Sequence, residues 1–327
     1  MSLDLLPVLL SNLLSPAVLF FALGVVATLV KSDLKFPEAL YTTLTLYLLV
    51  AIGFKGGVAI REAGILRVWQ PTLGAMILSA MIPLWTYPVL HFVGRFSKVD
   101  AAAISAHYGS VSAVTFIAAT QFLNQLGESY EAYAPAFLAV MEAPAILIGV
   151  VLGKLALPET KLPLKASLTE AIREAVLGRS VVLLVGALLI GWATGKRGAQ
   201  ITEGFFVSPF QGILALFLLE MGLVAARRFS DLRKVGIFLI AFSILAPLIN
   251  GFLGACMARW LGLGLGGSML LIVLSASASY IAAPAAMRLS LPEANPSFYL
   301  TASLAITFPF NLTIGLPLYL EMARWAS

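Results

Sequence analysis

The stretch "AAISAHYGSVSAVTF" (Ala102–Phe116) decides how this chain folds, because it places polar groups where a membrane span is expected. It lies between an apolar run that ends near Phe92 and another that begins near Tyr133. Within it stand a histidine, a glycine and three serines. Lipid offers no hydrogen-bond partners, so a broken, hydroxyl-rich segment is tolerated at mid-depth only where protein or a wet cavity surrounds it. The stretch therefore predicts a polytopic membrane protein with a polar interior.

The overall composition supports a membrane protein. Of the 327 residues, 60% are hydrophobic and 11% are charged, whereas about a quarter of a soluble globular domain is charged. The single cysteine, Cys256, excludes an intramolecular disulfide. The net charge of +5 comes from Lys and Arg scattered between apolar runs, which does not indicate a nucleic-acid surface. The N-terminus carries Asp4 and no basic segment, so we expect a span there rather than a cleaved signal.

Ten apolar segments are candidates to cross the hydrocarbon layer, which takes about 20 residues. They are Leu5–Val30, Phe36–Ile60, Pro71–Val93, Ala101–Leu123, Tyr133–Leu155, the shorter Ser180–Thr194, Phe206–Ala226, Val235–Leu261, Gly267–Leu289 and Ser297–Met322. We therefore expect an all-α polytopic protein with ten transmembrane helices. A polar connector between the fifth and sixth segments divides the chain into residues 1–157, a linker at 158–179, and residues 180–327.

The basic residues predict the orientation in the membrane. Loops after the odd-numbered segments carry fourteen of them: Lys31, Lys35, Arg95, Lys98, Lys154, Lys161, Lys165, Arg173, Arg179, Arg227, Arg228, Arg233, Lys234 and Arg288. The opposite side carries six: Arg61, Arg67, Lys196, Arg197, Arg259 and Arg324. Basic loops stay in the cytoplasm, so we expect the linker to be cytoplasmic and both termini to lie outside the cell membrane.

The two halves of the chain resemble each other. Within "GVAIREAGILRV" (Gly57–Val68), a valine, an alanine and an arginine recur at a constant offset in "LVAARRFSDLRKV" (Leu223–Val235). At nearly the same offset, "LAVMEAPAILIG" (Leu138–Gly149) matches "LAITFPFNLTIG" (Leu304–Gly315). Five spans are an odd number, so the second half must be inverted relative to the first. An inverted five-plus-five repeat is typical of secondary transporters.

The repeat pairs the opening stretch with "LSASASYIAAPA" (Leu274–Ala285). Both contain serines and a helix breaker, so we expect spans four and nine to break near Gly109 and near Ala282–Pro284, and to cross at mid-depth. The N-termini of broken helices favour an anion, and their C-termini and freed carbonyls favour a cation. The serine hydroxyls are then ligands for a small polar solute. The alternative is that the small residues only let helices pack closely.

A charged residue within a span raises the free energy of membrane insertion. Each one is therefore a candidate functional residue. Glu142 lies mid-span, and its repeat counterpart contains Thr307 and Asn311; we expect these to complete a cation site. Lys55 and Glu220 have opposite charges at nearly equivalent positions, so we expect an ion pair between two helices, with Lys55 acting on an anionic substrate as the alternative.

His107 is also polar at mid-depth. It is either an interhelical hydrogen-bonding group or a proton carrier. The broken segments contain no acid, so a cation there would meet mainly neutral oxygens, with Glu142 as the nearest carboxylate.

A set of motifs spread over nearly the whole chain resembles one known family. They are "IGFKGGVAIRE", "YGSVSAVTF", "SYEAY", "MEAPA", "LEMGL", "DLRKV", "SASASYIAAPAAMR" and "LPEANPSFYL", in this order. Together they resemble the sodium-dependent bicarbonate transporters known from cyanobacteria. The resemblance implies ten spans in an inverted repeat, a core that moves against a gate, a homotrimer, and sodium-coupled uptake of bicarbonate. It also implies regulation by a nucleotide-binding protein of the PII type.

The resemblance also assigns site residues. The first break carries Gly109, Ser110, Ser112 and Thr115, and the second carries Ser277, Ser279 and Tyr280. Cyanobacterial members have an aspartate where this chain has Tyr280. We therefore expect the Tyr280 phenol to replace a carboxylate and to donate a hydrogen bond to an anion. Sodium is the coupling ion, and we expect no other cofactor.

Other functions are open on sequence grounds. An organic-anion symporter of the bile-acid type shares the inverted architecture but needs a larger, more apolar cavity. A remote alternative is an intramembrane hydrolase with Ser110 as nucleophile and His107 as base. The chain has no Gly-x-Ser-x-Gly motif, so we expect a transporter and not an enzyme.

Overall fold

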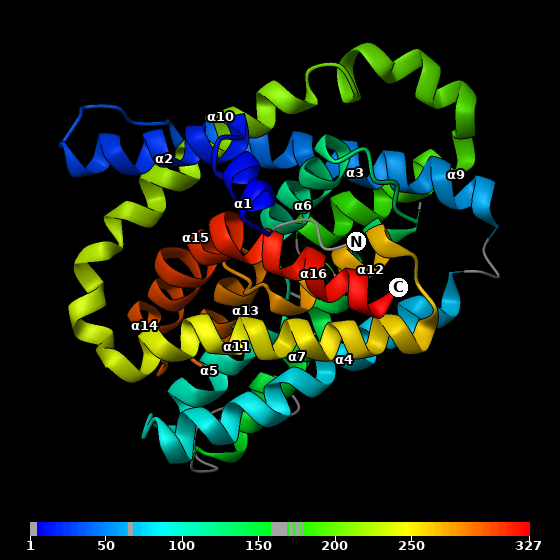
Figure 1. Cartoon of the computed structure of the whole chain (residues 1–327). Helices are drawn as coiled ribbons and strands as arrows, with labels where there is room; N and C mark the ends of the chain where they lie inside the picture. Colours follow the sequence, from blue (N-terminus) through cyan, green and yellow to red (C-terminus); the bar gives the residue numbers. More distant parts are fainter. Residues whose placement is uncertain are drawn as a thin grey trace.

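The structure is a computed structural model that describes residues 5–64, 68–131, 133–157, 169, 173, 177 and 179–327. The described residues form helices joined by turns and contain no strand (Figure 1). Most of the linker predicted at 158–179 lies outside the described residues. An all-helical protein of the expected class is therefore confirmed.

The helices of the first half follow the predicted segments closely. They are α1 (Leu5–Leu13), α2 (Pro16–Leu29), α3 (Glu38–Ala63), α4 (Trp69–Pro88) with a π-helical end at Val89–Val93, α5 (Lys98–Gly109), α6 (Ala113–Gln125) and α7 (Ala134–Leu155). α1 and α2 form one bent unit, with 59° between them. Ser15 caps α2 by accepting a hydrogen bond from the Val18 amide (3.3 Å), so the bend lies at a satisfied helix start.

The second half contains α9 (Arg179–Phe206), α10 (Phe210–Arg227), a 3₁₀ turn (Phe229–Asp231), α11 (Leu232–Leu261), α12 (Leu265–Ala276) and α13 (Ala282–Ser290). The last segment combines α14 (Pro296–Leu300), α15 (Phe308–Phe310) and α16 (Leu316–Ala326) with π-helical pieces at Thr301–Thr307 and Asn311–Gly315. Prolines at 309 and 317 lack an amide donor, which suits the wider π turns between these pieces.

Within the described residues, eight helices are long and apolar enough to span a membrane, or nine if α1 and α2 count as one. The predicted ninth segment corresponds to α12, a shorter apolar helix, followed by a non-helical stretch and α13. A break explains why this segment does not read as a continuous span. The number of ten spans and the inverted repeat remain predictions.

The sixth segment is longer than predicted. α9 continues beyond Thr194 to Phe206 after a kink at Gly195, whose φ of 59° suits glycine. The kink frees backbone carbonyls, and the Arg61 guanidinium donates to those of Trp192 (3.2 Å) and Ala193 (2.7 Å). The predicted end at Thr194 therefore marks the kink, not the end of the helix.

The helices form two bodies. We call α2, α3, α9 and α10 the panel, because α3 packs along α9 and α10 packs along α2. They surround the remaining helices at the top and left of Figure 1. Glycines allow this close packing: a Cβ on Gly57 would lie 1.9 Å from the Leu188 carbonyl oxygen, and one on Gly222 would lie 2.1 Å from that of Phe21. Such small-residue contacts are typical of membrane helices.

The second body, which we call the core, consists of α4 to α7 and α11 to α16. Its centre is α12, where residues 266–276 are all buried, and α5, where residues 101–109 are all buried. Helices α4, α7, α11 and α16 pack around these two. The two broken segments therefore lie inside the protein.

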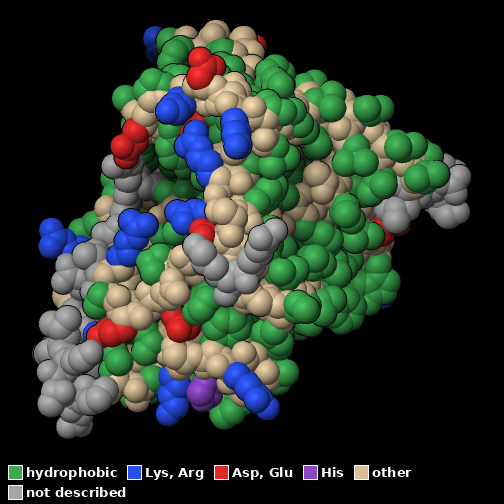
Figure 2. All heavy atoms as spheres, turned by 90° about the vertical axis from the view of Figure 1, so that its left-hand side faces the viewer, with side chains coloured by type: hydrophobic (Ala, Val, Ile, Leu, Met, Phe, Trp, Pro, Cys, Tyr) green, Lys and Arg blue, Asp and Glu red, His purple; other side chains and the backbone are tan. Residues whose placement is uncertain are grey.

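Figure 2 shows the end of the molecule that carries the turns between α2 and α3 and between α10 and α11. Lys and Arg side chains gather in a band on this face, and hydrophobic side chains cover the flank beside it. Exposed basic residues from these turns include Lys31, Lys35 and Arg227. An end rich in basic groups beside an apolar flank is the pattern of a membrane protein with one basic face.

Candidate functional site: two broken helices and an outer cavity

The first break follows Gly109, as predicted. α5 ends at Gly109, where a side chain would not fit: a Cβ would lie 2.6 Å from Cδ of Pro83 and 2.7 Å from Cβ of Ala145. The backbone is extended at Ser110 and Ser112 before α6 begins. The Ser112 hydroxyl accepts from the Thr115 amide (3.1 Å) and so caps α6. The chain therefore returns to a helical conformation within a few residues of the break.

The second break lies slightly earlier than predicted. α12 ends at Ala276, the backbone is extended at Ser277, and α13 begins at Ala282. The prediction of a break at Ala282–Pro284 is therefore wrong by a few residues. Pro284 stands in the first turn of α13, where an amide has no partner within the helix, so the proline is tolerated there.

The two breaks lie against each other, as the repeat predicted. The Ser112 amide donates to the Ser277 hydroxyl (2.9 Å), and the Ser279 amide donates to the His107 carbonyl (2.8 Å). The Ser112 hydroxyl also donates to the Tyr280 phenol oxygen (3.1 Å). Three hydrogen bonds therefore join the segments where their own helical bonds are missing.

Several of the predicted ligands are already hydrogen-bonded to protein. The Ser110 hydroxyl donates to the Glu142 carbonyl (3.2 Å), and the Ser277 hydroxyl donates to the Leu274 carbonyl (2.8 Å). The Thr115 hydroxyl donates to that of Ser112 (2.9 Å). These hydroxyls thus provide hydrogen bonds at the broken backbone. This is a structural role, as in the alternative to a ligand role that the sequence left open.

Asn311 is similarly engaged. Its amide nitrogen donates to the Ala276 carbonyl (2.9 Å), and its amide oxygen accepts from the Tyr319 phenol (2.7 Å). The side chain therefore holds the C-terminal end of α12. Its assignment as a cation ligand stays a prediction.

A small cavity of about 20 Å³ lies at the crossing, enough for about one water molecule. Its lining comes from both bodies. The core supplies Val111, Ser112, Ala113, Leu138, Glu142, Ser279, Tyr280 and Ile281, and the panel supplies Leu49 and Leu184. The structure thus brings Glu142 to the two breaks, although it lies on a different helix.

Three polar groups in this cavity retain unused bonding capacity. The Glu142 carboxylate is 8% exposed and forms no hydrogen bond or ion pair with the described residues. The Ser279 hydroxyl accepts from the Ala283 amide (3.2 Å), and the Tyr280 phenol accepts from Ser112, but neither donates to an acceptor within the described chain. The cavity therefore offers one carboxyl group and two hydroxyl donors.

His107 points away from this cavity. Its Nδ1 lies 2.7 Å from the Ala103 carbonyl on the same helix, and its ring stacks on Tyr299 at 4.3 Å. Its Nε2 has no partner among the described residues. The histidine is therefore not the interhelical hydrogen-bonding group that the sequence suggested. It also has no hydrogen bond to Ser110, so the pair has no hydrolase geometry.

Lys55 and Glu220 do not form the predicted ion pair. Glu220 is buried on α10, and its Oε2 has no partner in the described part of the chain. The Lys55 ammonium instead lies 4.7 Å from the centre of the Phe210 ring. Helix order alone did not specify which way each side chain turns, so the pairing prediction is wrong.

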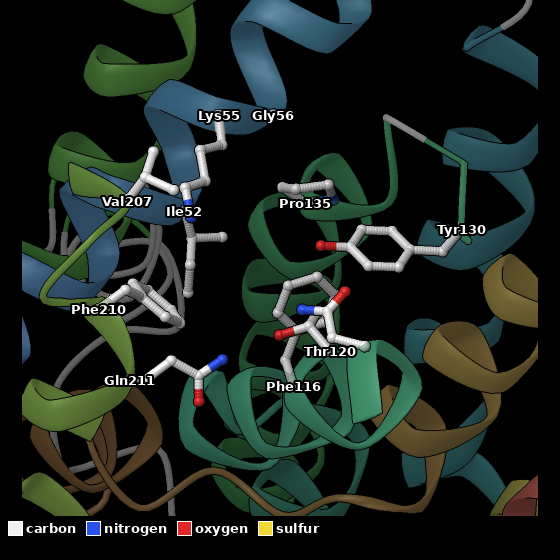
Figure 3. Close-up of a pocket in the computed structure, with 11 residues that line it drawn as sticks. Ile52, Lys55, Gly56, Phe116, Thr120, Tyr130, Pro135, Val207, Phe210 and Gln211 are labelled. Carbon is white, nitrogen blue, oxygen red and sulfur yellow. The ribbon is translucent and has the colours of Figure 1, made fainter. Parts of the chain in front are cut away.

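Lys55 faces a larger cavity of about 430 Å³ between the panel and the core (Figure 3). Its lining consists of Ile52, Lys55, Gly56, Phe116, Thr120, Asn124, Tyr130, Pro135, Val207, Phe210 and Gln211. The lining includes residues beside the turns that follow α6 and α9, which the orientation predicted from the basic residues places on the outer side. We call this the outer cavity.

The sequence did not single out most of the outer cavity. Tyr130, Thr120 and Gln211 were missed because each is an ordinary polar residue, in a loop, within a helix and at a helix start respectively. The motif "SYEAY" was a signal, since it places an aromatic hydroxyl beside a span. Among the described residues, no group of three His, Cys, Asp or Glu side chains is arranged to hold a metal ion.

Comparison with known protein families identifies the chain. A family model described as the Na⁺-dependent bicarbonate transporter superfamily matches residues 16–324. The match covers nearly the whole chain, so the chain belongs to this superfamily. The search of curated proteins found no match.

Proposed function

We propose that this member of the Na⁺-dependent bicarbonate transporter superfamily takes up bicarbonate, or a similar small anion, together with Na⁺. The observation that carries the proposal is the cavity where the two broken helices meet between the core and the panel. Its groups suit both partners, because Glu142 attracts a cation and the hydroxyls of Ser279 and Tyr280 can donate to an anion. Family membership supports the same substrates.

In this mechanism the Na⁺ binds beside the Glu142 carboxylate. Hydroxyl oxygens and the carboxyl ends of α5 and α12 add partial negative charge there. The anion binds at the N-termini of α6 and α13, which add partial positive charge. Each ion lessens the cost of placing the other in the interior, so the two are expected to bind cooperatively.

Movement of the core against the panel provides alternating access. Both cavities are lined by residues of both bodies, which supports a site that opens when the bodies separate. The outer cavity is much larger than the crossing cavity, about 430 Å³ against about 20 Å³, which supports a conformation that is open on the side of the outer cavity. Closing the outer cavity and parting the bodies at the basic face releases the solutes inside.

The size of the crossing cavity favours a small solute over a bile-acid-type anion. A cavity of about 20 Å³ has room for about one water-sized particle, so bicarbonate requires a modest widening as the core and the panel separate. A large organic anion needs a cavity of several hundred cubic ångströms. We therefore retain the small anion as substrate.

We further propose a homotrimer in the cell membrane with both termini outside. The basic face shown in Figure 2 supports a cytoplasmic position for that end. The cytoplasmic end is also where a PII-type regulator would bind. The two five-helix repeats, residues 1–157 and 180–327, are proposed as the structural basis of the transport cycle.

Uptake of labelled bicarbonate into proteoliposomes, with and without an inward Na⁺ gradient, tests the proposal. We expect saturable uptake that requires the Na⁺ gradient and is not replaced by a K⁺ gradient. Uptake independent of Na⁺ and linear with concentration would contradict it and would indicate a channel. Competition of formate, nitrate and taurocholate with bicarbonate uptake then defines the size of the anion that the site accepts.

A further inference from the structure

The outer cavity has an unusual charge distribution. Among the described residues of its lining, Lys55 is the only charged one, and none of them carries a carboxylate. Figure 3 shows Lys55 on α3, facing a cavity whose opposite wall carries Tyr130, Thr120 and Pro135. A cavity with one positive charge and neutral donors is suited to an anion.

The Lys55 charge is not neutralised by the protein. The ammonium rests over the Phe210 ring at 4.7 Å, a contact that positions a cation without cancelling its charge. Lys55 forms no ion pair with any described residue, and Glu220 lies elsewhere. The positive charge is therefore available to a solute in the cavity.

The opposite wall is fixed by a separate contact. Glu131 accepts from the Gly264 amide (2.6 Å) and so anchors its loop at the N-terminus of α12. Beside it, Tyr130 packs against Gly266, where a Cβ would lie 2.7 Å from Cβ of Tyr130. Burial raises the pKa of the Tyr130 phenol, so it stays protonated and can donate a hydrogen bond. Glu131 is engaged elsewhere and adds no charge to the lining.

The outer cavity and the crossing cavity lie at successive levels of the same two helices. On α3, Leu49 lines the crossing cavity and Lys55 lines the outer one; six residues span about 9 Å of helix. On α6, Ala113 lines the first and Thr120 the second. The two cavities therefore lie one after the other along α3 and α6, and in the proposed transport cycle a solute from the outer cavity passes Lys55 before it reaches Glu142.

We propose that the outer cavity is a loading site for a small oxyanion, anchored by Lys55, and that it fills before Na⁺ enters. The proposal rests on the proposed function and adds a second site and an order of binding to it. An uncompensated ammonium attracts the anion and repels Na⁺. Once the anion has neutralised Lys55, the cation can pass to Glu142. Binding of the anion thus removes the repulsion between Lys55 and the entering Na⁺.

Kinetics of Lys55→Gln test this order. We expect the KM for bicarbonate to rise about three- to tenfold and the half-saturating Na⁺ concentration to fall about twofold, because one charge both attracts the anion and repels the cation. Lys55→Arg keeps the charge and should retain wild-type values. Lys196→Gln is the matched control: it removes a charge near the same outer end, where Lys196 lies 3.5 Å from Glu62, and should change neither constant. An unchanged KM for bicarbonate, or a rise in both constants, would overturn the proposal.

A labelling experiment gives an answer even if bicarbonate is not the substrate. Gln211 is replaced by Cys in a Cys256→Ser background, and the new thiol is treated with anionic and cationic methanethiosulfonates of similar size. We expect the anionic reagent to react at least about threefold faster, and Lys55→Gln to abolish the difference. Equal rates with Lys55 present would overturn the loading site. A rate difference in the Gln211→Cys, Cys256→Ser protein, together with no Na⁺-driven uptake by the wild-type protein, would instead contradict the proposed function.

Discussion

The crossing and the outer cavity use polar residues in opposite ways. At the crossing, the hydroxyls of Ser110, Ser112 and Ser277 donate to protein oxygens. In the outer cavity, the Lys55 ammonium is unpaired and faces open space. At the crossing, most polar groups form hydrogen bonds that hold a broken backbone together. In the outer cavity, the polar groups line open space.

Hydroxyl content alone therefore does not identify a transport site. Buried backbone groups must be satisfied, so a broken helix needs serines even before it binds anything. The groups that remain unused are the better candidates. At the crossing these are Glu142, Ser279 and Tyr280.

The largest effect is expected for Glu142→Gln. The amide keeps the shape but removes the only carboxylate of the crossing cavity, and an interaction with a charged group contributes about 1.5–3 kcal/mol. We expect half-saturation by Na⁺ to require about 10- to 100-fold more sodium, measured as initial bicarbonate uptake. Glu220→Gln, another buried acid outside the cavity, serves as control. Wild-type Na⁺ dependence in Glu142→Gln would remove the carboxylate from the mechanism.

Gly109→Ala tests the rigidity of the crossing. The added methyl group would lie within 3 Å of Pro83 and Ala145, and overpacking costs about 1–3 kcal/mol. We expect a lower thermal midpoint in detergent and reduced uptake. Gly212→Ala on α10, where a Cβ meets nothing within 4 Å, should raise or keep the midpoint. If both variants melt like the wild type, the break does not require a glycine.

Tyr280 separates substrate contact from packing. Tyr280→Phe removes a hydroxyl that can donate to an anion, so we expect the KM for bicarbonate to rise about two- to tenfold at normal expression. Tyr280→Asp adds a negative charge and should strengthen Na⁺ dependence. Tyr108→Phe is a control at a fully buried phenol that bonds Thr307 (2.7 Å) outside the cavity. Unchanged kinetics in Tyr280→Phe would mean that this ring only packs.

The smallest effects should distinguish two serines. Ser110→Ala removes a donor to the Glu142 carbonyl, so we expect a stability loss of about 0.5–1.5 kcal/mol with little change in KM. Ser279→Ala removes a hydroxyl whose hydrogen has no acceptor in the described chain, so we expect a KM change of about two- to fivefold. Thermal melting and uptake kinetics on the same preparations check both. The reverse pattern would invert the assignment of structural and substrate-binding hydroxyls.

The sequence predicted the large features because they follow from one-dimensional patterns. Apolar length placed the helices, and Gly109 marked the first break. The second break was displaced because Pro284 suits a helix start as well as a helix end, and the sequence does not distinguish them. The kink in α9 was read as a helix end for a similar reason, since Gly195 interrupts the apolar run.

Side-chain pairing was less predictable. Lys55 and Glu220 have opposite charges on neighbouring helices, but the rotation of each helix decides whether they meet, and no pattern in the chain fixes it. The outer cavity was missed because its residues come from α3, α6, α7, α10 and the segments between them. The motifs that contain some of these residues do not show that they meet. Sites formed between two bodies are visible only once the bodies are placed.

The single carboxylate of the crossing cavity has an energetic consequence. Because Glu142 is the one acidic side chain among the described residues that line this cavity, we expect one Na⁺ per monovalent anion. Such a pair carries no net charge, so the membrane voltage, worth about 2.3 kcal/mol per charge per 100 mV, does no work on it. Only the sodium concentration ratio drives accumulation: a tenfold ratio, about 1.4 kcal/mol, supports a tenfold anion gradient. A single cation site at the crossing thus limits how much anion a cell can accumulate with a given sodium gradient.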